Sequence, residues 1–332
     1  MAGRRTNLAL LAALVVATGT GVGAFAVGTV TGRTMVVAHG VAGIAVVLLS
    51  PWKQQIVRRG LRRRRRAHRA GLVLLCLVAV TVAAGVAHAA DAGPFAGVTA
   101  MQVHVTAAVL AVIPAAWHVA RRPVRLRLAD LDRRATVRAA ALTLGAGVAW
   151  RAADALYVLG DGGPRRFTGS HERGSDAPDR MPVTQWLSDV VPDLAPGQWA
   201  LEVADADGVR RLSVRDLRAA PSVTRRAVLD CTGGWFAAQT WSGVPLAAFV
   251  AGDAGRRVVV TSTTGYARAF PVEALDHLLL ALDVAGAPLS PGHGAPARLV
   301  APGRRGFWWV KWVRRISVDD LPPWAQPPFP VQ

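Results

Sequence analysis

Cys231 is the residue whose type and surroundings most clearly allow chemistry. It lies in the segment Leu229-Asp-Cys-Thr-Gly-Gly-Trp235, and the only other cysteine in the sequence, Cys76, is part of a long apolar run. A lone thiolate in a turn rich in glycine and tryptophan is unsuited to a structural disulfide, but it is a soft ligand for a metal ion. From these residues alone, the alternative is a buried and inert cysteine.

Histidines inside apolar runs are a second candidate for chemistry, because ionisable residues are costly within a membrane. His39 and His104 lie near the outer ends of the second and fourth apolar runs, which places them at similar depth if the runs cross in opposite directions. Two histidines on facing helices can ligate a b-type haem, and Gly40 and Gly43 would let a flat ring approach. The alternative is a pair of polar residues hydrogen-bonded within a helical bundle.

A second haem is a further possibility with less support. His118 follows His104 by 14 residues, close to four helical turns, so the two share one helix face. The position 14 residues after His39 is Lys53, which is not a usual haem ligand. His68 in a basic loop is a possible substitute, and His88 could assist the outer pair.

The elements that position these histidines are five apolar stretches, each long enough to cross a bilayer as a helix of about 20 residues. They are Asn7–Val30, Thr34–Pro51, Ala70–Ala89, Val98–Ala120 and Val137–Leu159. Glycine and alanine are frequent in them and permit close helix packing. The chain is 52% hydrophobic overall, and we expect it to be embedded in a lipid bilayer.

The net charge of +18 comes largely from two arginine clusters, Arg58–Arg69 and Arg121–Arg134, in alternate loops. No aromatic residues are interleaved with these arginines, which argues against nucleic acid as a partner. By the positive-inside rule both loops are cytoplasmic. We therefore expect a multi-pass protein of a bacterial plasma membrane, with its N-terminus in the cytoplasm and its C-terminal domain extracytoplasmic.

After Gly160 the composition changes to that of a mixed α/β domain, with more Pro, Asp and Gly. The expected strands are Trp199–Val203, Ala227–Asp230, Arg257–Ser262, Ala297–Val300 and Trp308–Val313, and the expected short helices are Val214–Leu217, Pro245–Val250 and Pro271–Leu275. The expected organisation is a transmembrane bundle over 1–160, a linker over 161–180, the α/β domain over 181–320 and an extended, Pro-rich tail over 321–332.

Several motifs of this C-terminal half occur in a characteristic order. They are Pro182–Leu187, Cys231 with Gly233-Gly-Trp235, Trp241–Leu246, Thr264-Gly-Tyr266 with Phe270-Pro271, Gly292–Val300 and Gly306–Val313. Together they resemble the molybdopterin-binding domain of the sulfite oxidase family of oxidoreductases. We expect a compact domain, without the second, immunoglobulin-like domain of the eukaryotic members.

The resemblance implies a molybdenum ion held by a pterin dithiolene and by one cysteine, which would be Cys231. It also implies that His293, Arg298 and Lys311 bind the cofactor, and that Tyr266 borders the substrate pocket as a catalytic residue. Lys311 lies among tryptophans, so its ammonium group should have a buried partner. Thr168, Ser170 and His171 are further candidates for the cofactor's edge.

The expected function is oxo-transfer on a small oxo-acceptor or oxo-donor at an extracytoplasmic molybdenum site, as in sulfite oxidases or sulfoxide reductases. A bundle haem, in a domain that resembles a b-type cytochrome, would exchange electrons with membrane quinone or another redox partner. Two alternatives stay open: a cofactor-free membrane scaffold or binding module, and a molybdenum enzyme served by a separate cytochrome. Arg133-Arg134 is either an internal twin-arginine export signal or an ordinary positive-inside pair.

Overall fold

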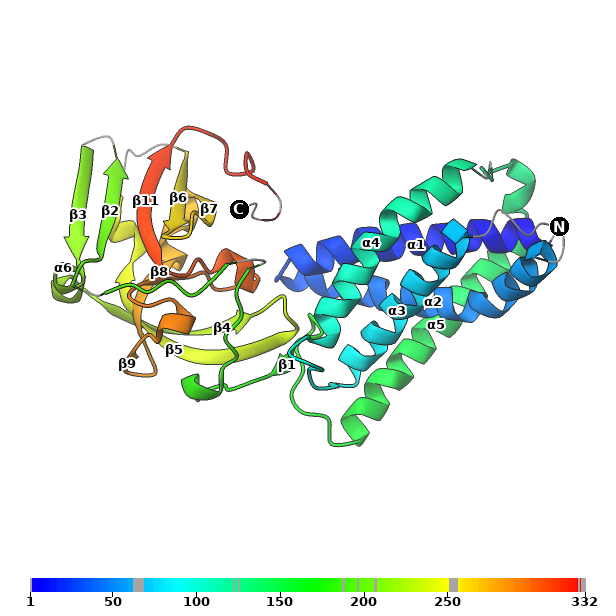
Figure 1. The fold of residues 1–332 in the computed structure, drawn as a ribbon, viewed down its shortest axis with the longest axis horizontal. Coiled ribbons are helices and arrows are strands. Elements are labelled where there is room, and N and C mark those ends of the chain that lie inside the picture. The colour runs from blue at the N-terminus through cyan, green and yellow to red at the C-terminus, as the bar shows by residue number, and fades with distance from the viewer. Residues whose placement is uncertain are drawn as a thin grey trace. The chain divides into compact units, whose positions relative to one another are not determined.

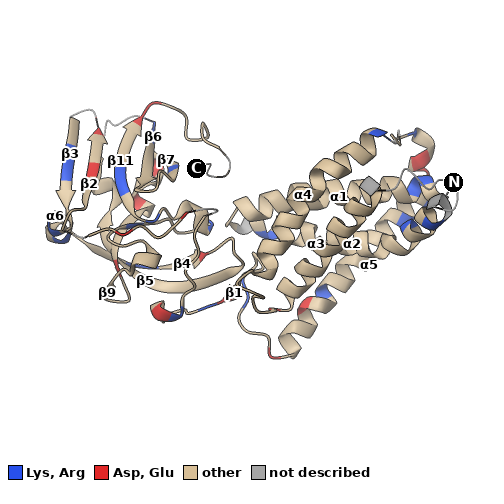
Figure 2. Cartoon of the chain, in the orientation of Figure 1, with Lys and Arg blue, Asp and Glu red and all other residues tan. Residues whose placement is uncertain are grey.

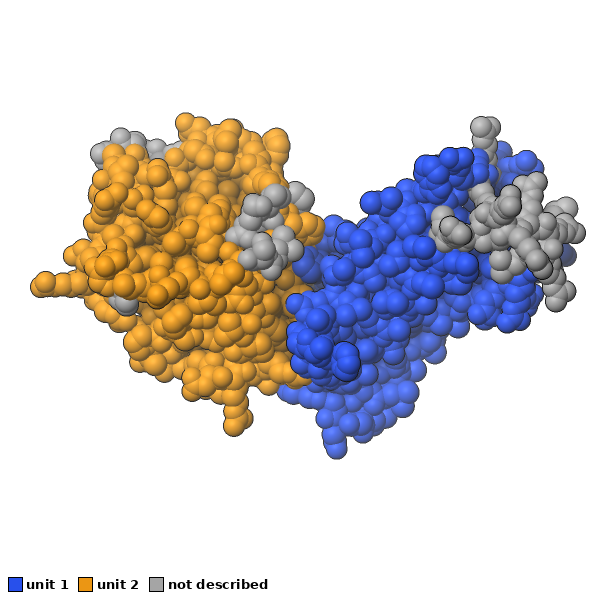
Figure 3. All heavy atoms as spheres, viewed as in Figure 1, with its two compact units in different colours: residues 1–25, 30–169 blue, residues 26–29, 170–332 orange. Residues whose placement is uncertain are grey.

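The computed structural model of the chain describes residues 2–61, 69–121, 123–124, 126–186, 189–195, 197–205, 208–250, 256–327 and 329. The chain divides into two compact units, residues 1–25 with 30–169 and residues 26–29 with 170–332 (Figure 3). His68 and the arginines at 62–66 lie outside the described residues.

The described part of the first unit is built from long helices (Figure 1). They are α1 (Ala2–Ala26), α2 (Val30–Leu61), α3 (Arg69–Ala89), α4 (Ala100–Arg121) and α5 (Arg133–Leu159). Helix α3 packs along α4, and α2 packs along α5. The buried positions are mostly alanines, namely Ala42, Ala45, Ala84, Ala107 and Ala146, so small side chains let the helix backbones approach closely.

Among the described residues, four helices are long and apolar enough to cross a membrane. They are found within Gly3–Ala26, Thr31–Arg58, Gly71–Ala89 and Ala100–Arg121. The fifth expected span coincides with α5, which is one continuous helix but is not among these four. Helix α5 carries several arginines and Asp154, which lower its apolar character.

Basic side chains of the helical unit gather near its N-terminus. Figure 2 shows Lys and Arg concentrated around the N-terminus and the helix ends beside it, whereas the middle of the helices is mostly uncharged. Arg4 forms an ion pair with Asp130, and Arg5 forms one with Asp132, each at 2.8 Å. Asp132 also caps α5 by accepting a hydrogen bond from the Ala135 N–H, so the start of α1 is tied to the start of α5.

The second unit contains two sheets. The first has the order β1-β5-β8-β10, with β4 paired to β5 and β9 paired to β8. Its strands are β1 (His171–Glu172), β4 (Val223–Asp230), β5 (Trp235–Pro245), β8 (Leu279–Val284), β9 (Ala287–Pro288) and β10 (Arg298–Val300). The second has the order β3-β2-β11-β6-β7. Its strands are β2 (Ala200–Asp205), β3 (Gly208–Ser213), β6 (Arg257–Ser262), β7 (Ala267–Pro271) and β11 (Val313–Asp319).

Both sheets contribute to one hydrophobic core. Trp241 and Leu280 come from the first sheet, and Leu201, Val260 and Ile316 come from the second; all five are fully buried. Burial alternates along β2 and β5, as expected for strands with one face against a core. The short helices described in this unit are α6 (Val214–Ala219) and the 3₁₀ turns Pro178–Arg180, Leu246–Phe249, Val272–His277, Pro291–His293 and Gly306–Trp308, whereas the 3₁₀ turn Leu128–Leu131 belongs to the first unit.

The expected strand over Trp308–Val313 is wrong. Gly306–Trp308 is a 3₁₀ turn, and β11 begins only at Val313. Trp312 has a left-handed backbone with φ of 49°, which cannot continue a strand. The segment expected as a linker is also more ordered than its composition suggests, because β1 pairs with β5 and buries His171.

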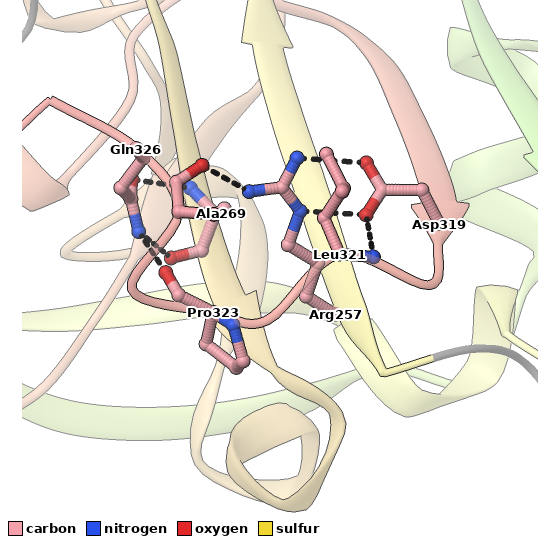
Figure 4. Close-up of polar contacts among 7 residues, drawn as sticks. Arg257, Ala269, Asp319, Leu321, Pro323 and Gln326 are labelled. Carbon is pink, nitrogen blue, oxygen red and sulfur yellow. Dashed lines mark hydrogen bonds and ion pairs between the residues drawn. The ribbon is translucent and has the colours of Figure 1, made fainter.

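The described part of the tail after β11 makes hydrogen bonds to the second sheet (Figure 4). The Arg257 guanidinium donates to both carboxylate oxygens of Asp319 and to the Ala325 carbonyl. The Gln326 side chain accepts a hydrogen bond from the Ala269 N–H and donates one to the Ala269 carbonyl. These contacts occupy backbone groups of β7, the last strand in the order of its sheet.

Candidate functional site

Cys231 lies in the tight turn between β4 and β5. Its N–H donates to the Trp235 carbonyl at 2.8 Å, and its carbonyl accepts from the Gly234 N–H at 3.1 Å. Gly234 has φ of 92°, a conformation that favours glycine. The Gly233 N–H points to the Cys231 sulfur at 3.3 Å. The sulfur is therefore held by the backbone of a turn in which the positive φ of Gly234 favours glycine.

A pocket opens beside this sulfur. Its lining comes from the opening segment of the domain, the Cys231 turn, the end of β6 with the turn that follows it, and the two late motifs. The lining residues are Pro182, Thr184, Gln185, Trp186, Asp189, Leu229, Cys231, Thr232, Trp235, Ser262, Tyr266, His293, Arg298, Gly306, Phe307, Trp309, Lys311 and Trp312. The structure thus brings together the five residues expected at the molybdenum site, Cys231, Tyr266, His293, Arg298 and Lys311.

Arg298 is the more deeply buried of the two cations in the pocket wall. It is 2% exposed, begins β10, and donates to the His293 carbonyl at 3.1 Å. Its guanidinium lies 5.4 Å from the Trp241 ring and 5.7 Å from the Trp309 ring. Burial lowers its pKa to about 10, so it stays charged at neutral pH.

Lys311 is the second cation, and its ammonium group has the buried partners expected from the sequence. It donates to the Thr184 carbonyl at 2.8 Å and to the Gly292 carbonyl at 2.7 Å. Burial, with a smaller contribution from Arg298, lowers its pKa to about 7. Lys311 is therefore poised to change charge near neutral pH.

His293 and Cys231 are both shifted toward their neutral forms. Burial, followed by repulsion from Arg298 and Lys311, lowers the pKa of His293 to about 4, so the imidazole is neutral at pH 7. Burial raises the pKa of the Cys231 thiol, while the Gly233 N–H and the charges of Arg305 and Lys311 act in the opposite direction. These positive groups favour a negative charge on the sulfur once a ligand replaces its proton.

Aromatic side chains form another part of the wall. The Tyr266 hydroxyl donates to the Phe307 carbonyl, and burial raises its pKa, so it is a neutral group at physiological pH. Trp186 lies edge-on to Tyr266 and is tilted against Phe307. Asp189 accepts a hydrogen bond from Thr264 and is the one carboxylate among the lining residues that the structure describes.

The donors in this pocket suit an anionic, polar ligand. The Nε of Arg298 and the Nε2 of Gln185 are buried without a hydrogen-bond partner, which is costly unless a ligand supplies an acceptor. Within the described residues, no group of three His, Cys, Asp or Glu side chains could hold a metal ion. A metal at Cys231 would thus take its other ligands from a bound group. A molybdenum ion carried by a pterin dithiolene fits this donor set.

Some residues do not lie where the sequence suggested, and others were missed. Thr168, Ser170 and His171 are buried but do not line the pocket, and Ser170 donates to Asp230 behind the Cys231 turn. Gln185 and Asp189 also line the pocket; Gln185 lies within the first motif, and Asp189 lies outside all the motifs. Arg305 lies next to a motif glycine, but its pairing with Asp230 spans 75 residues and leaves no sequence signal.

In the helical unit, the structure brings His39 of α2 and His104 of α4 together. Their ring centroids are 5.7 Å apart and the planes are nearly perpendicular, at 88°. The Nδ1 atom of His39 bonds to the Ala17 carbonyl and that of His104 bonds to the Thr81 carbonyl, each at 2.8 Å. Because a carbonyl can only accept, Nδ1 carries the proton and Nε2 of a neutral ring is left as a metal-binding lone pair.

Two glycines lie against this histidine pair. A Cβ at Gly21 would lie 3.0 Å from the His39 ring, and one at Gly85 would lie 2.9 Å from the His104 ring. Gly40 instead faces the Trp150 ring, and a Cβ at Gly43 would meet nothing within 4 Å. Small residues thus make room for both imidazoles.

The residues considered for a second haem lie elsewhere in the helical unit. Lys53, at the position where a second haem would need a ligand, donates to Asn7 at 2.8 Å. His118 lies in the last turn of α4. His88, at the end of α3, bonds to the Gly169 carbonyl at 3.1 Å. A second haem site with His118 stays a hypothesis.

Comparison with known proteins supports the expected family. The oxidoreductase molybdopterin binding domain matches residues 188–325. Mitochondrial sulfite oxidase of Rattus norvegicus is 30% identical over 168 residues, which cover 39% of this chain and 31% of that protein. The uncharacterized oxidoreductase YuiH of Bacillus subtilis is 30% identical over 163 residues, 44% of this chain and 82% of that protein.

The chain spans about a third of the length of the mitochondrial sulfite oxidases it matches. Among solved structures, the sulfane dehydrogenase SoxCD from Paracoccus pantotrophus matches with a TM-score of 0.37 and 27% identity, covering 40% of each chain.

Proposed function

Because this chain belongs to the family of oxidoreductases with a molybdopterin-binding domain, we propose that it is a membrane-bound molybdenum enzyme for oxo-transfer. The observation that carries the proposal is the pocket in which the Cys231 thiol meets two buried cations and two unpartnered N–H groups. Its substrate is a small oxo-acceptor or oxo-donor. When bound, the cofactor supplies two-electron redox chemistry at the metal.

The residues around the pocket have different roles in binding that cofactor. Cys231 supplies the protein's thiolate ligand, at a position that the turn fixes before the cofactor arrives. Arg298 and Lys311 offset negative charge on the cofactor, and the free Nε of Arg298 offers it a hydrogen bond. His293 stays neutral and so avoids adding a third charge to the wall. The cofactor is thus bound by groups whose orientation depends on the protein alone.

Tyr266 and the neighbouring aromatic residues shape the place where a substrate would lie. Its hydroxyl proton is engaged by the Phe307 carbonyl, so Tyr266 orients a substrate through the hydroxyl oxygen and ring rather than by losing its proton. Trp186 and Phe307 exclude water from the same wall. Polar contacts made in this dry environment are stronger than in water.

In the helical unit, we assign His39 and His104 as axial ligands of one b-type haem. Support comes from their facing rings and from Nδ1 protons engaged by backbone carbonyls, which leave both Nε2 atoms for iron. A haem here would pass single electrons between the molybdenum site and membrane quinone or another redox partner. His118 as a ligand of a second haem stays a hypothesis without structural support.

The proposed topology has five spans in the plasma membrane of a bacterium. The N-terminus and the arginine-rich loops are cytoplasmic, and the molybdenum domain, over 181–320, is extracytoplasmic. Helix α5 then serves as the fifth span. Arg133-Arg134, exposed in its first turn, are suited to a twin-arginine export signal, because a domain loaded with cofactor in the cytoplasm has to cross folded.

A reduced-minus-oxidised visible spectrum of the detergent-purified protein tests the electron-transfer part. We expect a b-type haem band that disappears in His39→Ala and in His104→Ala but persists in His88→Ala. A folded preparation from haem-replete cells without this band would leave a molybdenum enzyme served by a separate cytochrome. Absence of both haem and molybdenum would instead favour the cofactor-free scaffold.

A further inference from the structure

Arg305 is a buried cation that lies behind the Cys231 turn and not in the pocket. It is 3% exposed, and the pocket lining includes its neighbour Gly306 but not Arg305 itself. A residue in this place cannot touch a substrate in the pocket. Any influence that it has on the chemistry must pass through Cys231.

The guanidinium of Arg305 reaches both residues that carry the turn. Nη1 donates to the Asp230 carboxylate at 2.6 Å, and Nη2 donates to the Cys231 carbonyl at 3.3 Å. The Asp230 carboxylate is 3% exposed and also accepts a hydrogen bond from Ser170 at 2.7 Å. Because Arg donors form a rigid planar fork, one group can fix a carboxylate and a neighbouring carbonyl together.

The backbone of Arg305 and Gly306 also lies close to the backbone of Asp230 and Cys231. Asp230 and Arg305 form a parallel β-bridge. A Cβ at Gly306 would lie 3.0 Å from the Cys231 Cα and 3.3 Å from the Asp230 carbonyl oxygen. Arg305 and Gly306 therefore pack directly against the backbone of Asp230 and Cys231, and the Arg305 side chain fixes that packing.

We propose that Arg305, paired with Asp230, is a positioning residue that fixes the Cys231 turn and so orients the thiolate toward the molybdenum. The catalytic consequence rests on the proposed function, whereas the fixing of the turn does not. Groups that orient a metal ligand from behind commonly change metal affinity or activity by roughly 10- to 100-fold when they are removed. Arg305 adds a fixed positive charge beside a sulfur that would be negative when metal-bound.

The test uses the full-length, detergent-purified chain. The main variant is the double substitution Arg305→Met with Asp230→Asn, which removes the pair without leaving a lone buried charge. Arg304→Met is the matched control, because Arg304 is adjacent but exposed. Hydrogen exchange is followed for the amides of residues 231–236, with β8 as an internal reference. Retained molybdenum after dialysis and the line shape of the Mo(V) resonance after partial reduction are measured in parallel.

The proposal predicts that exchange in 231–236 accelerates at least tenfold in the double variant while β8 is unchanged. Molybdenum affinity should fall roughly 10- to 100-fold, and the Mo(V) line shape should change. Arg304→Met should match the wild type in every measurement. Wild-type exchange and an unchanged line shape in a folded double variant would overturn the proposal.

Two further outcomes are possible, and each can be distinguished from a failure of the proposal about Arg305. If the double variant does not fold, Arg305→Lys decides instead, because it keeps the charge but cannot bridge both partners; the wild-type exchange pattern in that variant would overturn the proposal. If the wild type itself holds no molybdenum, the proposed function fails, and the exchange rates alone decide whether Arg305 fixes the turn.

Discussion

Lys311 should lose its proton near neutral pH in the cofactor-free protein. Its ammonium group is buried against the Trp312 ring and two carbonyls, and burial lowers its pKa from 10.5 to about 7. At about 1.4 kcal/mol per pKa unit, this difference corresponds to about 5 kcal/mol between the charged and neutral forms. Between pH 7 and 10.5 the unfolded chain binds more protons than the folded one, so stability rises with pH in this window.

The sequence makes this titration directly measurable, because Lys53 and Lys311 are the only lysines in the chain. Protein labelled with ¹³C at lysine Cε gives two lysine signals, and the variant Lys53→Arg assigns them. We expect the Lys311 signal to titrate near pH 7 without cofactor and at higher pH with cofactor bound, since an anionic ligand favours the ammonium form.

The variant Lys311→Met tests how the titration of Lys311 affects stability. The free energy of unfolding of the wild type should increase by about 2 to 4 kcal/mol relative to Lys311→Met between pH 7 and 10, part of the full difference being lost to solvent screening. A Lys311 signal that titrates near pH 10.5, or parallel stability curves for the two proteins, would refute the burial argument for this residue.

Further predictions concern the turn, the core and the tail. Gly306→Ala should reduce molybdenum content and thermal stability, because its Cβ would lie 3.0 Å from the Cys231 Cα; unchanged values would contradict the packing. Trp241→Ala should cost about 3 to 5 kcal/mol in a denaturant titration, because the side chain is fully buried. Asp319→Asn should weaken the attachment of the tail above pH 4. Arg257 lowers the pKa of Asp319 below its ordinary value of 3.8, so this stabilisation is lost as the pH falls through the lowered value and the variant and wild type then converge.

Much of the fold could be predicted from local sequence patterns. Apolar runs predicted the helices, and short apolar or β-prone runs predicted β2, β4 and β6, because the burial of an element determines the pattern of neighbouring residues. The wrong prediction of a strand over Trp308–Val313 has the same origin in local sequence pattern. The residues of this segment are aromatic or β-branched except for Lys311, which is typical of a strand, but Trp312 adopts positive φ without a glycine to signal it.

The candidate site was predictable where a motif carries several of its members. Cys231, Arg298 and Lys311 lie in motifs whose order resembles one family, and the structure places all three on one pocket. The pairing of Asp230 with Arg305 was not predictable, because their contact is created only when the two segments fold against each other. The same holds for the Nδ1 hydrogen bonds that orient His39 and His104.

The most direct test of the account is the molybdenum content of the full-length protein, purified from molybdate-replete cells beside Cys231→Ala. We expect an equimolar amount of molybdenum with pterin in the wild type, and almost none in a Cys231→Ala variant that keeps the wild-type circular dichroism spectrum. A folded wild type without molybdenum, or a Cys231→Ala variant that retains the wild-type amount, would contradict the assignment of this pocket.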